Sequence, residues 1–233
     1  MTVEVQEIES FYGDLQVLRK VSLSVREGEV VALLGPNGHG KSTLLKAMAG
    51  LHPPTSGSVR YNGEDISRAS NEKIVQMGLA YIPEERHLFP YTTVLENLRL
   101  GAYNPRARGR IGENLDFVFA LFPRLEERKD QLCSTLSGGE SRMVAIGRGL
   151  MSDATFLMVD EPSIGLSPAV KRAVFDSIQK INQDRGNSIL IVEQEIEHAL
   201  RLASRIYLMK KGQILMERNA VEIEKAEIEK AYF

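Results

Sequence analysis

Residues 35–42, GPNGHGKS, constrain the fold of this chain more than any other segment. They match the phosphate-binding pattern GxxxxGK[ST] at every fixed position, and such a loop needs a buried strand before it and a helix after it. The continuous apolar run at 30–34 predicts the strand, and the apolar residues that follow Lys41 have helical spacing up to Gly50. The sequence therefore predicts an α/β unit that binds phosphate at a helix N-terminus.

The residue types in this phosphate loop match the chemistry of a bound nucleotide. Its glycines allow backbone conformations in which successive amide groups turn toward a phosphate. Lys41 supplies a charge for the β and γ phosphates, and Ser42 supplies an oxygen for Mg²⁺. The predicted nucleotide contacts in and after the loop are Gly35, Pro36, Asn37, Gly38, His39, Gly40, Lys41, Ser42 and Thr43. His39 stands where small residues are usual, and two interpretations stay open: a solvent-facing substitution, or a histidine that touches the γ phosphate or a facing subunit.

Two adjacent carboxylates, Asp160 and Glu161, follow the apolar run at 155–159. In open parallel sheets, ligands bind at the carboxyl ends of the strands. Asp160 is predicted to hold Mg²⁺, usually through water. Glu161 is predicted to orient or deprotonate the attacking water, because phosphoryl transfer depends mostly on positioning and charge neutralisation. The alternative for Glu161 is a surface acid at the end of a strand.

A second glycine-rich turn, LSGGE at 136–140, opens another predicted helix. Its residues Ser137, Gly138, Gly139 and Glu140 form a second anion-binding helix N-terminus. One chain cannot easily fold two such turns onto the same γ phosphate. The simplest arrangement is that this signature turn closes over ATP bound to a second subunit. The alternative is an ordinary helix start with flexible glycines.

The apolar patterns on either side of the signature turn differ in period. Strands at 155–159, 188–192, 205–209 and 213–217 alternate with helices at 168–184 and 195–203, which indicates a mainly parallel sheet with helices on its faces. The region 92–151 lacks strand runs and is expected to be helical, with a capping box at Thr93 and Glu96.

Two charged segments receive only structural interpretations. The sequence NPRARGR at 104–110 predicts an exposed basic loop, with a solvated loop favoured over an anion site. The tail from Ala220 predicts a helix on which Glu222 pairs with Lys225 and Glu227 pairs with Lys230.

Composition limits the partners that this chain is expected to have. A net charge of -2 and a pI near 6.2 argue against an obligatory nucleic-acid binder. The apolar runs are far shorter than the roughly 18 residues that span a bilayer. The acidic N-terminus does not resemble a secretory signal, so export is not expected. The single cysteine, Cys133, is typical of a reducing compartment.

The order of GPNGHGKS, LSGGE and an apolar run that ends in Asp160-Glu161-Pro162 resembles the ATP-binding subunits of ABC transporters over nearly the whole chain. The segments YIPE, LFPRLEER, VDEPSIGLSP and IVEQE look like the subfamily that serves branched-chain amino-acid uptake, with urea and amide importers as near relatives. The resemblance implies a single domain, 1–233, with a P-loop NTPase (RecA-like) α/β core at 1–91 and 152–233. This core would have a mainly parallel sheet, an N-terminal antiparallel β part and an inserted helical subdomain at 92–151.

The resemblance also implies roles for residues that the motifs leave open. Tyr12 matches the aromatic residue that stacks on adenine, whereas a bare aromatic at this position would otherwise indicate strand-end packing. Glu84 lies in the loop that senses the γ phosphate and touches the membrane subunit, and it is a candidate metal ligand. Gln194 matches the catalytic switch position, and 163–167 match the loop that crosses the dimer interface.

Three of these positions depart from the general family pattern, in which Gln replaces Glu84, Asp replaces Ser167 and His replaces Gln194. Gln194 still donates a hydrogen bond to a γ phosphate but carries no positive charge. Ser167 also suits a helix cap, because Pro168 follows at the first helical position. These substitutions are usual in the subfamily, and they leave the hydrolysis rate open.

The implied function is an ATPase, with Lys41, Glu161 and Gln194 as its catalytic residues and ATP and Mg²⁺ as its cofactors, located in the cytoplasm on the inner face of a membrane importer. ATP would draw together two such subunits, identical or related, and integral membrane permease subunits would convert their closing into transport. A solute-binding protein would deliver the cargo, which this sequence does not identify. The alternatives are a soluble ABC ATPase in DNA repair or translation, and a regulator that closes on ATP without turnover.

Overall fold

The structure is a computed structural model that describes residues 3–232. Its strands are β1 (Val3–Tyr12), β2 (Leu15–Val25), β3 (Val30–Leu34), β4 (Ser56–Tyr61), β5 (Glu64–Asp65), β6 (Leu79–Ile82), β7 (Phe156–Asp160), β8 (Ser188–Glu193), β9 (Arg205–Lys210) and β10 (Gln213–Asn219). Its α-helices are α1 (Lys41–Met48), α2 (Asn71–Met77), α3 (Val94–Leu100), α4 (Pro105–Arg108), α5 (Ile111–Leu121), α6 (Pro123–Glu127), α7 (Gly138–Leu150), α8 (Pro168–Arg185), α9 (Ile196–Leu202) and α10 (Lys225–Tyr232).

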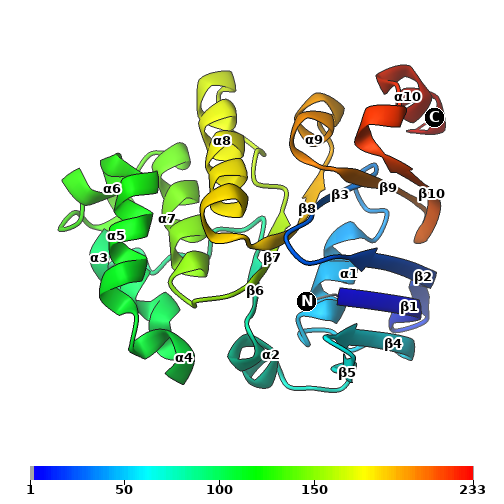
Figure 1. The fold of residues 1–233 in the computed structure, drawn as a ribbon, viewed down its shortest axis with the longest axis horizontal. Helices are drawn as coiled ribbons and strands as arrows, with labels where there is room; N and C mark the ends of the chain where they lie inside the picture. The colour runs from blue at the N-terminus through cyan, green and yellow to red at the C-terminus, as the bar shows by residue number, and fades with distance from the viewer. Residues whose placement is uncertain (1–2, 233) are drawn as a thin grey trace.

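The strands form two sheets. The six-stranded sheet has the order β10-β9-β3-β8-β7-β6 and is parallel except for the β9–β10 hairpin. The four-stranded sheet has the order β2-β1-β4-β5 and is antiparallel. The predicted α/β fold, with a mainly parallel sheet and an N-terminal antiparallel part, is therefore confirmed. In Figure 1 the antiparallel strands lie at one end of the molecule and α3 to α7 gather at the other.

The strand β3 is apolar throughout because it contributes to two cores. Val30, Ala32 and Leu34 belong to a core with the helices α3, α5, α7, α8 and α9. The alternate residues Val31 and Leu33 belong to a second core, between α1 and the antiparallel sheet. A strand that is covered on both faces has no need for polar alternation, and its loops leave the sheet at a rigid edge.

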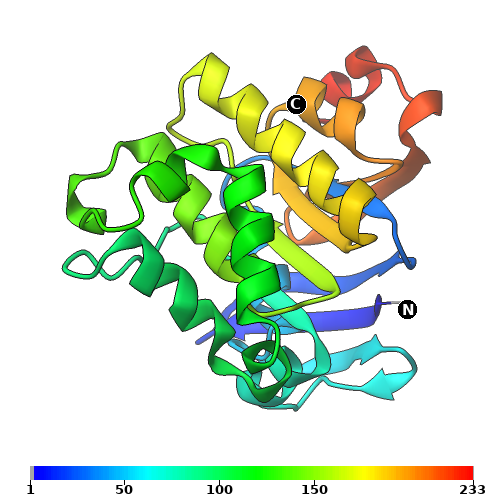
Figure 2. The same cartoon turned by 60° about the vertical axis from the view of Figure 1, so that its left-hand side comes forward.

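The region between β6 and β7 is helical, as its lack of strand runs predicts. Thr93 caps α3 in the expected box, since its hydroxyl accepts from the amide of Glu96 and the Glu96 carboxylate accepts from the amide of Thr93. Figure 2 shows α3, α5 and α7 together on one side of the six-stranded sheet. Gly147 of α7 permits the close approach of α3 and α5, because a Cβ there would lie 2.8 Å from Leu98 and 2.9 Å from Val118.

The basic segment 104–110 is largely exposed, as predicted, but it contains a short helix and is not a loop throughout. Asn104 instead caps the short helix α4, and its side-chain oxygen accepts from the amide of Ala107. Two of the arginines bind one acid far along the chain: Arg106 Nε lies 3.5 Å and Arg110 Nη1 2.8 Å from the carboxylate of Asp153. The basic residues therefore pair with an acid on the chain that follows α7.

The C-terminal tail also differs from its prediction. Glu222 ends a 3₁₀ turn before the helix, and α10 begins only at Lys225, whose ammonium pairs with Glu197 of α9 at 2.5 Å. The predicted contact between Glu222 and Lys225 is thus replaced by a contact between helices. Within residues 3–232 no helix combines the length and the apolar character that crossing a bilayer requires.

Candidate active site

The register of three adjacent strands brings the predicted site residues together. Leu34, the last residue of β3, pairs with Glu193 of β8, and Val192 of β8 pairs with Asp160 of β7. The phosphate loop, the residues after β8 and the acids that end β7 therefore leave the same edge of the sheet. This edge is formed by the carboxyl ends of parallel strands, where ligands bind in open α/β sheets.

The phosphate loop is shaped by glycines at two sites of close approach. Gly40 is the N-cap of α1 with φ 101°, a left-handed conformation that a side chain would strain. A Cβ on Gly35 would lie 2.3 Å from the carbonyl oxygen of Met209. Lys41 is 3% exposed, and its ammonium donates to the carbonyls of Gly35 at 2.8 Å and Pro36 at 3.0 Å. The lysine is therefore held inside its own loop.

Lys41, Glu161 and Gln194 form one connected cluster. Lys41 Nζ lies 3.1 Å from Glu161 Oε1, and the Gln194 side-chain amide donates to Glu161 Oε2. Both carboxylate oxygens of Glu161 are thus engaged. Glu161 also has a φ of 41°, a strained conformation of a kind that clusters at functional sites. The backbone is fixed there because the Glu161 amide donates to Val192 at 3.0 Å.

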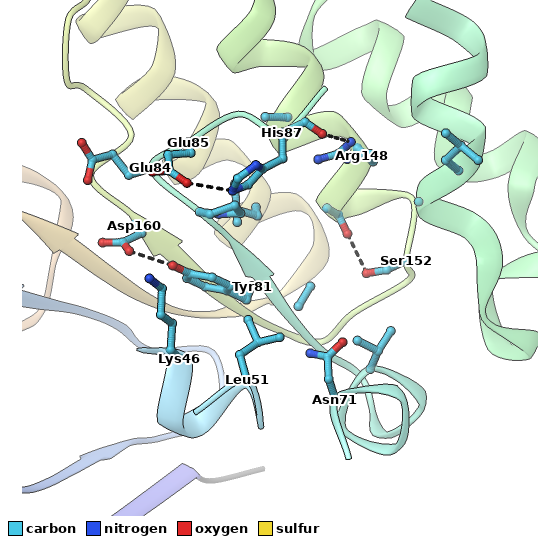
Figure 3. Close-up of a pocket in the computed structure, with 18 of the residues that line it drawn as sticks. Lys46, Leu51, Asn71, Tyr81, Glu84, Glu85, His87, Arg148, Ser152 and Asp160 are labelled. Carbon is cyan, nitrogen blue, oxygen red and sulfur yellow. Dashed lines mark hydrogen bonds and ion pairs between the residues drawn. The ribbon is translucent and has the colours of Figure 1, made fainter. Parts of the chain in front are cut away.

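The side chain of Asp160 is held between two hydroxyl groups. Ser42 Oγ donates to Asp160 Oδ1 at 3.1 Å. Tyr81 Oη donates to Oδ2 at 2.9 Å, as Figure 3 shows. Tyr81 was not among the predicted site residues, because nothing in the local sequence shows which acid its hydroxyl reaches. Burial, together with the charge of Asp160, raises the pKa of Tyr81, so its hydroxyl stays protonated and donates.

Burial raises the pKa values of Asp160 and Glu84, and the charge of Glu161 contributes to each. Burial is the main cause of the raised pKa of Asp160, and Glu161 adds repulsion. Burial is also the main cause of the raised pKa of Glu84, followed by the charges of Glu161 and Asp160. Such a surplus of negative charge favours a bound cation. The oxygens of Ser42 and Asp160 are ligands that Mg²⁺ prefers, and one or two protein oxygens suffice when phosphates supply the others.

Glu84 is placed less closely than the other predicted metal ligands. Its side chain is exposed and lines a cleft, whereas Ser42 and Asp160 are in direct contact. Among residues 3–232, no three His, Cys, Asp or Glu side chains cluster in a manner that would hold a metal ion. The structure therefore brings together two of the three predicted ligands.

His39 connects the phosphate loop to the β9–β10 turn. Its Nδ1 accepts from the amide of Lys211 at 3.3 Å, and its carbonyl accepts from the amide of Gly212 at 3.1 Å. Partial burial and then the charge of Lys41 lower the pKa of the imidazole. The side chain is therefore half-buried and bonded, unlike the solvent-facing substitution that the sequence left open.

Tyr12, the predicted adenine-stacking residue, packs against a histidine of its own chain. Its ring stacks on His52, with ring centres 4.3 Å apart and planes 7° from parallel. A cleft of about 470 Å³ lies beside Gly38 instead, lined by 15–17, Arg19 and the 211–213 turn. The 211–213 turn was not predicted to contribute to the site, and Tyr12 does not line this cleft.

The signature turn begins α7 with a complete capping box. Ser137 Oγ accepts from the amide of Glu140 at 3.3 Å, and the Glu140 carboxylate accepts from the amide of Ser137 at 2.9 Å. Ser137 and Gly138 are exposed, and a Cβ on Gly138 would lie 3.4 Å from the guanidinium of Arg86. No hydrogen bond or ion pair within residues 3–232 joins 137–139 to the phosphate loop. The chain thus presents two separate anion-binding turns.

Arg142 of α7 links the signature helix to the segment that carries Glu161. It is 1% exposed, and its guanidinium donates to the carbonyls of Pro83 at 2.8 Å, Glu84 at 2.8 Å and Glu161 at 3.1 Å. Arg148, six residues further along the helix, donates to the carbonyls of Arg86 and His87. The loop after β6 is therefore fastened to α7 by two arginines.

Arg142→Gln is expected to lower the free energy of unfolding by about 3 kcal/mol, because buried carbonyls lose charged hydrogen-bond donors. Urea unfolding followed by circular dichroism measures the change. Arg172→Gln removes the same charge from an exposed position of α8 and is expected to have an effect below about 0.5 kcal/mol. Equal stability of the two variants would contradict the bridging role of Arg142.

Comparisons with known proteins agree with this geometry. The ABC transporter family model matches residues 18–164. The high-affinity branched-chain amino acid transport ATP-binding protein BraG of Pseudomonas aeruginosa is 41% identical over 90% of this chain and 89% of its own. The probable branched-chain amino acid transport ATP-binding protein LivF of Archaeoglobus fulgidus is 35% identical over 91% and 89%.

A solved structure extends the comparison to the fold. It is the dimeric, post-hydrolysis state of an ATP-binding cassette bound to ADP and Pi, with a TM-score of 0.80 at 25% identity, covering 94% of this chain and 98% of that one. The family model covers more than half of the chain, and BraG matches nearly all of it. This chain belongs to the ABC transporter family.

Proposed function

We propose that this chain is the ATP-hydrolysing subunit of an ABC importer, and that it works as a head-to-tail dimer with an identical or related subunit. The observation that carries the proposal is the convergence of Lys41, Asp160, Glu161 and Gln194 at one sheet edge, while Ser137 begins a second anion site elsewhere. A phosphate that is held by a phosphate loop and a signature turn needs these two turns to face each other. Two chains in opposite orientation bring the phosphate loop of one to the signature turn of the other. The dimeric solved structure supports this arrangement.

The chemistry at the phosphate loop follows from the contacts of its residues. When ATP binds, the Lys41 ammonium turns from Glu161 toward the β and γ phosphates, which frees one carboxylate oxygen. Glu161 then orients a water for attack and takes its proton, and Gln194 holds the other oxygen in place. Ser42 and Asp160 would hold Mg²⁺, which neutralises phosphate charge. Tyr81 fixes the carboxylate of Asp160 from its other side.

The signature turn supplies the second half of the site. Ser137 Oγ already accepts a hydrogen bond from Glu140, so its own proton is free to be donated to a phosphate oxygen. The amides at the start of α7 add the positive end of a 13-residue helix. Together with Gly138 and Gly139, Ser137 closes over the ATP of the partner subunit.

The adenosine half of the nucleotide is proposed to extend from the phosphate loop into the cleft beside Gly38. The stacking of Tyr12 on His52 leaves Tyr12 47% exposed, so stacking of adenine on Tyr12 stays a prediction. Replacing Val17, which lines the cleft, tests the placement separately.

A larger cleft, of about 770 Å³, is proposed to receive a cytoplasmic segment of the permease. It lies between the β6 edge of the sheet and the helices α3 and α7, and Glu84, Tyr81 and Asp160 are among the residues that line it (Figure 3). Exposed apolar side chains line its outer part: Leu51, Phe89, Leu100 and Tyr103. Exposed apolar surface of this kind marks interaction sites. A permease segment there would touch the loop after β6, which Arg142 joins to the backbone of Glu161.

Phe89→Ser is expected to reduce recovery of the membrane partners at least tenfold when the tagged chain is purified from membranes in mild detergent, because burial of a phenylalanine stabilises an interface by about 2 kcal/mol. Tyr91→Ser is the matched control, since Tyr91 is 86% exposed but does not line the cleft. Equal recovery with both variants would contradict docking at this cleft.

The proposed cargo is a branched-chain amino acid or a related small polar solute, because BraG and LivF are named for transport of the former. Cells that lack this chain would lose uptake of labelled leucine, isoleucine or valine, and Glu161→Gln would fail to restore it. Mg²⁺-dependent ATPase activity with undiminished uptake of these solutes would favour the soluble ATPase. The absence of turnover even in the assembled complex would favour the nucleotide-gated regulator. As a transporter subunit the chain would lie on the cytoplasmic face of the membrane.

A further inference from the structure

The site, as described so far, gives no task to the buried carboxylate of Glu193. It ends β8 directly before Gln194 and is 2% exposed. Its oxygens face hydrogen-bond donors from two different loops. Ser163 donates from its amide to Oε1 at 3.3 Å and from its hydroxyl to Oε2 at 3.1 Å, and the amide of Gln194 donates to Oε2 at 3.2 Å.

These bonds join two loops with different surroundings. Ser163 begins the loop 163–167, which follows β7 and Glu161, and Ile164 in this loop is 40% exposed. Gln194 lies on the other side of Glu193, and its side chain donates to Glu161. A displacement of the loop is thus transmitted through one carboxylate to the group that holds Glu161.

We propose that Glu193 is a positioning residue that couples the loop 163–167 to Gln194, so that contact of a second subunit with the loop controls the hold of Gln194 on Glu161. The proposal rests on the proposed function, because the partner that reaches Ile164 is the second subunit of the dimer. It assigns no contact between Glu193 and ATP. Glu193 acts only through Ser163 and Gln194.

The charge of Glu193 matters because all of its bonded partners are donors. An ionised carboxylate accepts from the Ser163 amide, the Ser163 hydroxyl and the Gln194 amide, whereas a protonated one has less acceptor capacity. Burial raises the pKa of Glu193 to about 7, against hydrogen bonds from Ser163 and the 194 and 195 amides that lower it. The charge of Glu193 also acts on the guanidinium of Arg142 in α7.

Two other acids near these loops have cationic partners. Glu161 is paired with Lys41, and Lys171 of α8 pairs with Glu195. Glu193 therefore ionises as pH rises through about 7, and the coupling of Ser163 to Gln194 strengthens in the same direction. The pH profile of wild-type kcat is therefore expected to have an ascending limb near pH 7.

The test uses the full chain in its membrane complex and compares Glu193→Gln with Glu197→Gln. Glu197 is an exposed acid of α9 that pairs with Lys225, so the control removes the same charge without touching Gln194. Glu193→Gln is expected to lower kcat roughly tenfold, because it loses acceptors for charge-assisted hydrogen bonds. The KM for ATP is expected to stay within about twofold, since Glu193 touches no nucleotide, and the limb near pH 7 is expected to disappear.

A second variant distinguishes coupling from a general structural role. Ser163→Ala removes one of the bonds to Glu193 and is expected to lower kcat in the same manner, and the double variant is expected to be no slower than Glu193→Gln alone. The proposal would be overturned if the loss of kcat in the double variant equalled the product of the losses in the two single variants. So would a kcat for Glu193→Gln within twofold of wild type at every pH. If Glu193→Gln does not fold, an unchanged kcat and pH profile in Ser163→Ala overturn it instead.

The same measurements separate this inference from the proposed function. Wild-type chain without ATP turnover and without ATP-driven association would refute the ATPase dimer itself. Normal wild-type turnover and association, with Glu193→Gln indistinguishable from Glu197→Gln, would refute only the coupling.

Discussion

Glu161→Gln is expected to bind ATP normally and to lose steady-state hydrolysis by at least about a hundredfold, the usual contribution of a general base. The amide keeps the size of the carboxylate and still accepts from Lys41, which retains its bonds to Gly35 and Pro36. It cannot take a proton from water. The rate of phosphate release by detergent-solubilised complexes at saturating ATP measures hydrolysis.

Nucleotide affinity is the control readout for this variant. Lys41 leaves Glu161 when phosphate binds, so loss of the carboxylate removes a competitor and the affinity for ATP is expected to stay equal or to increase. Glu64→Gln, which removes an exposed charge on β5, is expected to leave both affinity and turnover unchanged. Turnover of Glu161→Gln within tenfold of wild type would show that another group activates the water.

Ser137→Arg is expected to leave ATP binding to the isolated chain unchanged and to abolish ATP-driven association. The signature turn is exposed and makes no hydrogen bond to the phosphate loop of its own chain, so the substitution does not reach the nucleotide in cis. A long side chain on the turn blocks the close approach of a partner's phosphate. Light scattering with ATP in the Glu161→Gln background measures association.

The cost of this substitution to folding is expected to be small. Loss of the Ser137 cap destabilises α7 by about 1 kcal/mol. Ser134→Arg adds the same cation to an exposed position just before the turn and is the matched control. Association of Ser137→Arg at the ATP concentration that suffices for Ser134→Arg would show that the turn does not act across subunits.

The convergence of the phosphate loop with Asp160 and Glu161 was predictable because each motif follows a continuous apolar run. Such runs indicate strands buried on both faces, and parallel strands place their carboxyl ends at one edge. The capping box at Thr93 was predictable from local spacing, since its two partners are three residues apart. Local spacing is sufficient information for features of this kind.

Features that depend on distant partners were missed. The bonds of Arg142 reach 58 to 59 residues back and 19 residues forward along the chain, and no local pattern marks a buried arginine. The segment NPRARGR was interpreted as a solvated loop because its acid, Asp153, lies more than forty residues away. The tail was assigned an internal pair because Glu197 on α9, the partner of Lys225, is distant in sequence.

The central claim is that one working site needs the phosphate loop of one chain and the signature turn of another. The most direct measurement mixes two inactive variants, Lys41→Ala and Ser137→Arg, and follows ATP hydrolysis. A mixed dimer combines the intact phosphate loop of the second with the intact signature turn of the first. The mixture is expected to recover about a quarter of wild-type activity, since half of the dimers are mixed and each has one intact site. If each chain held a complete site of its own, mixing would recover nothing, and that result would contradict the account.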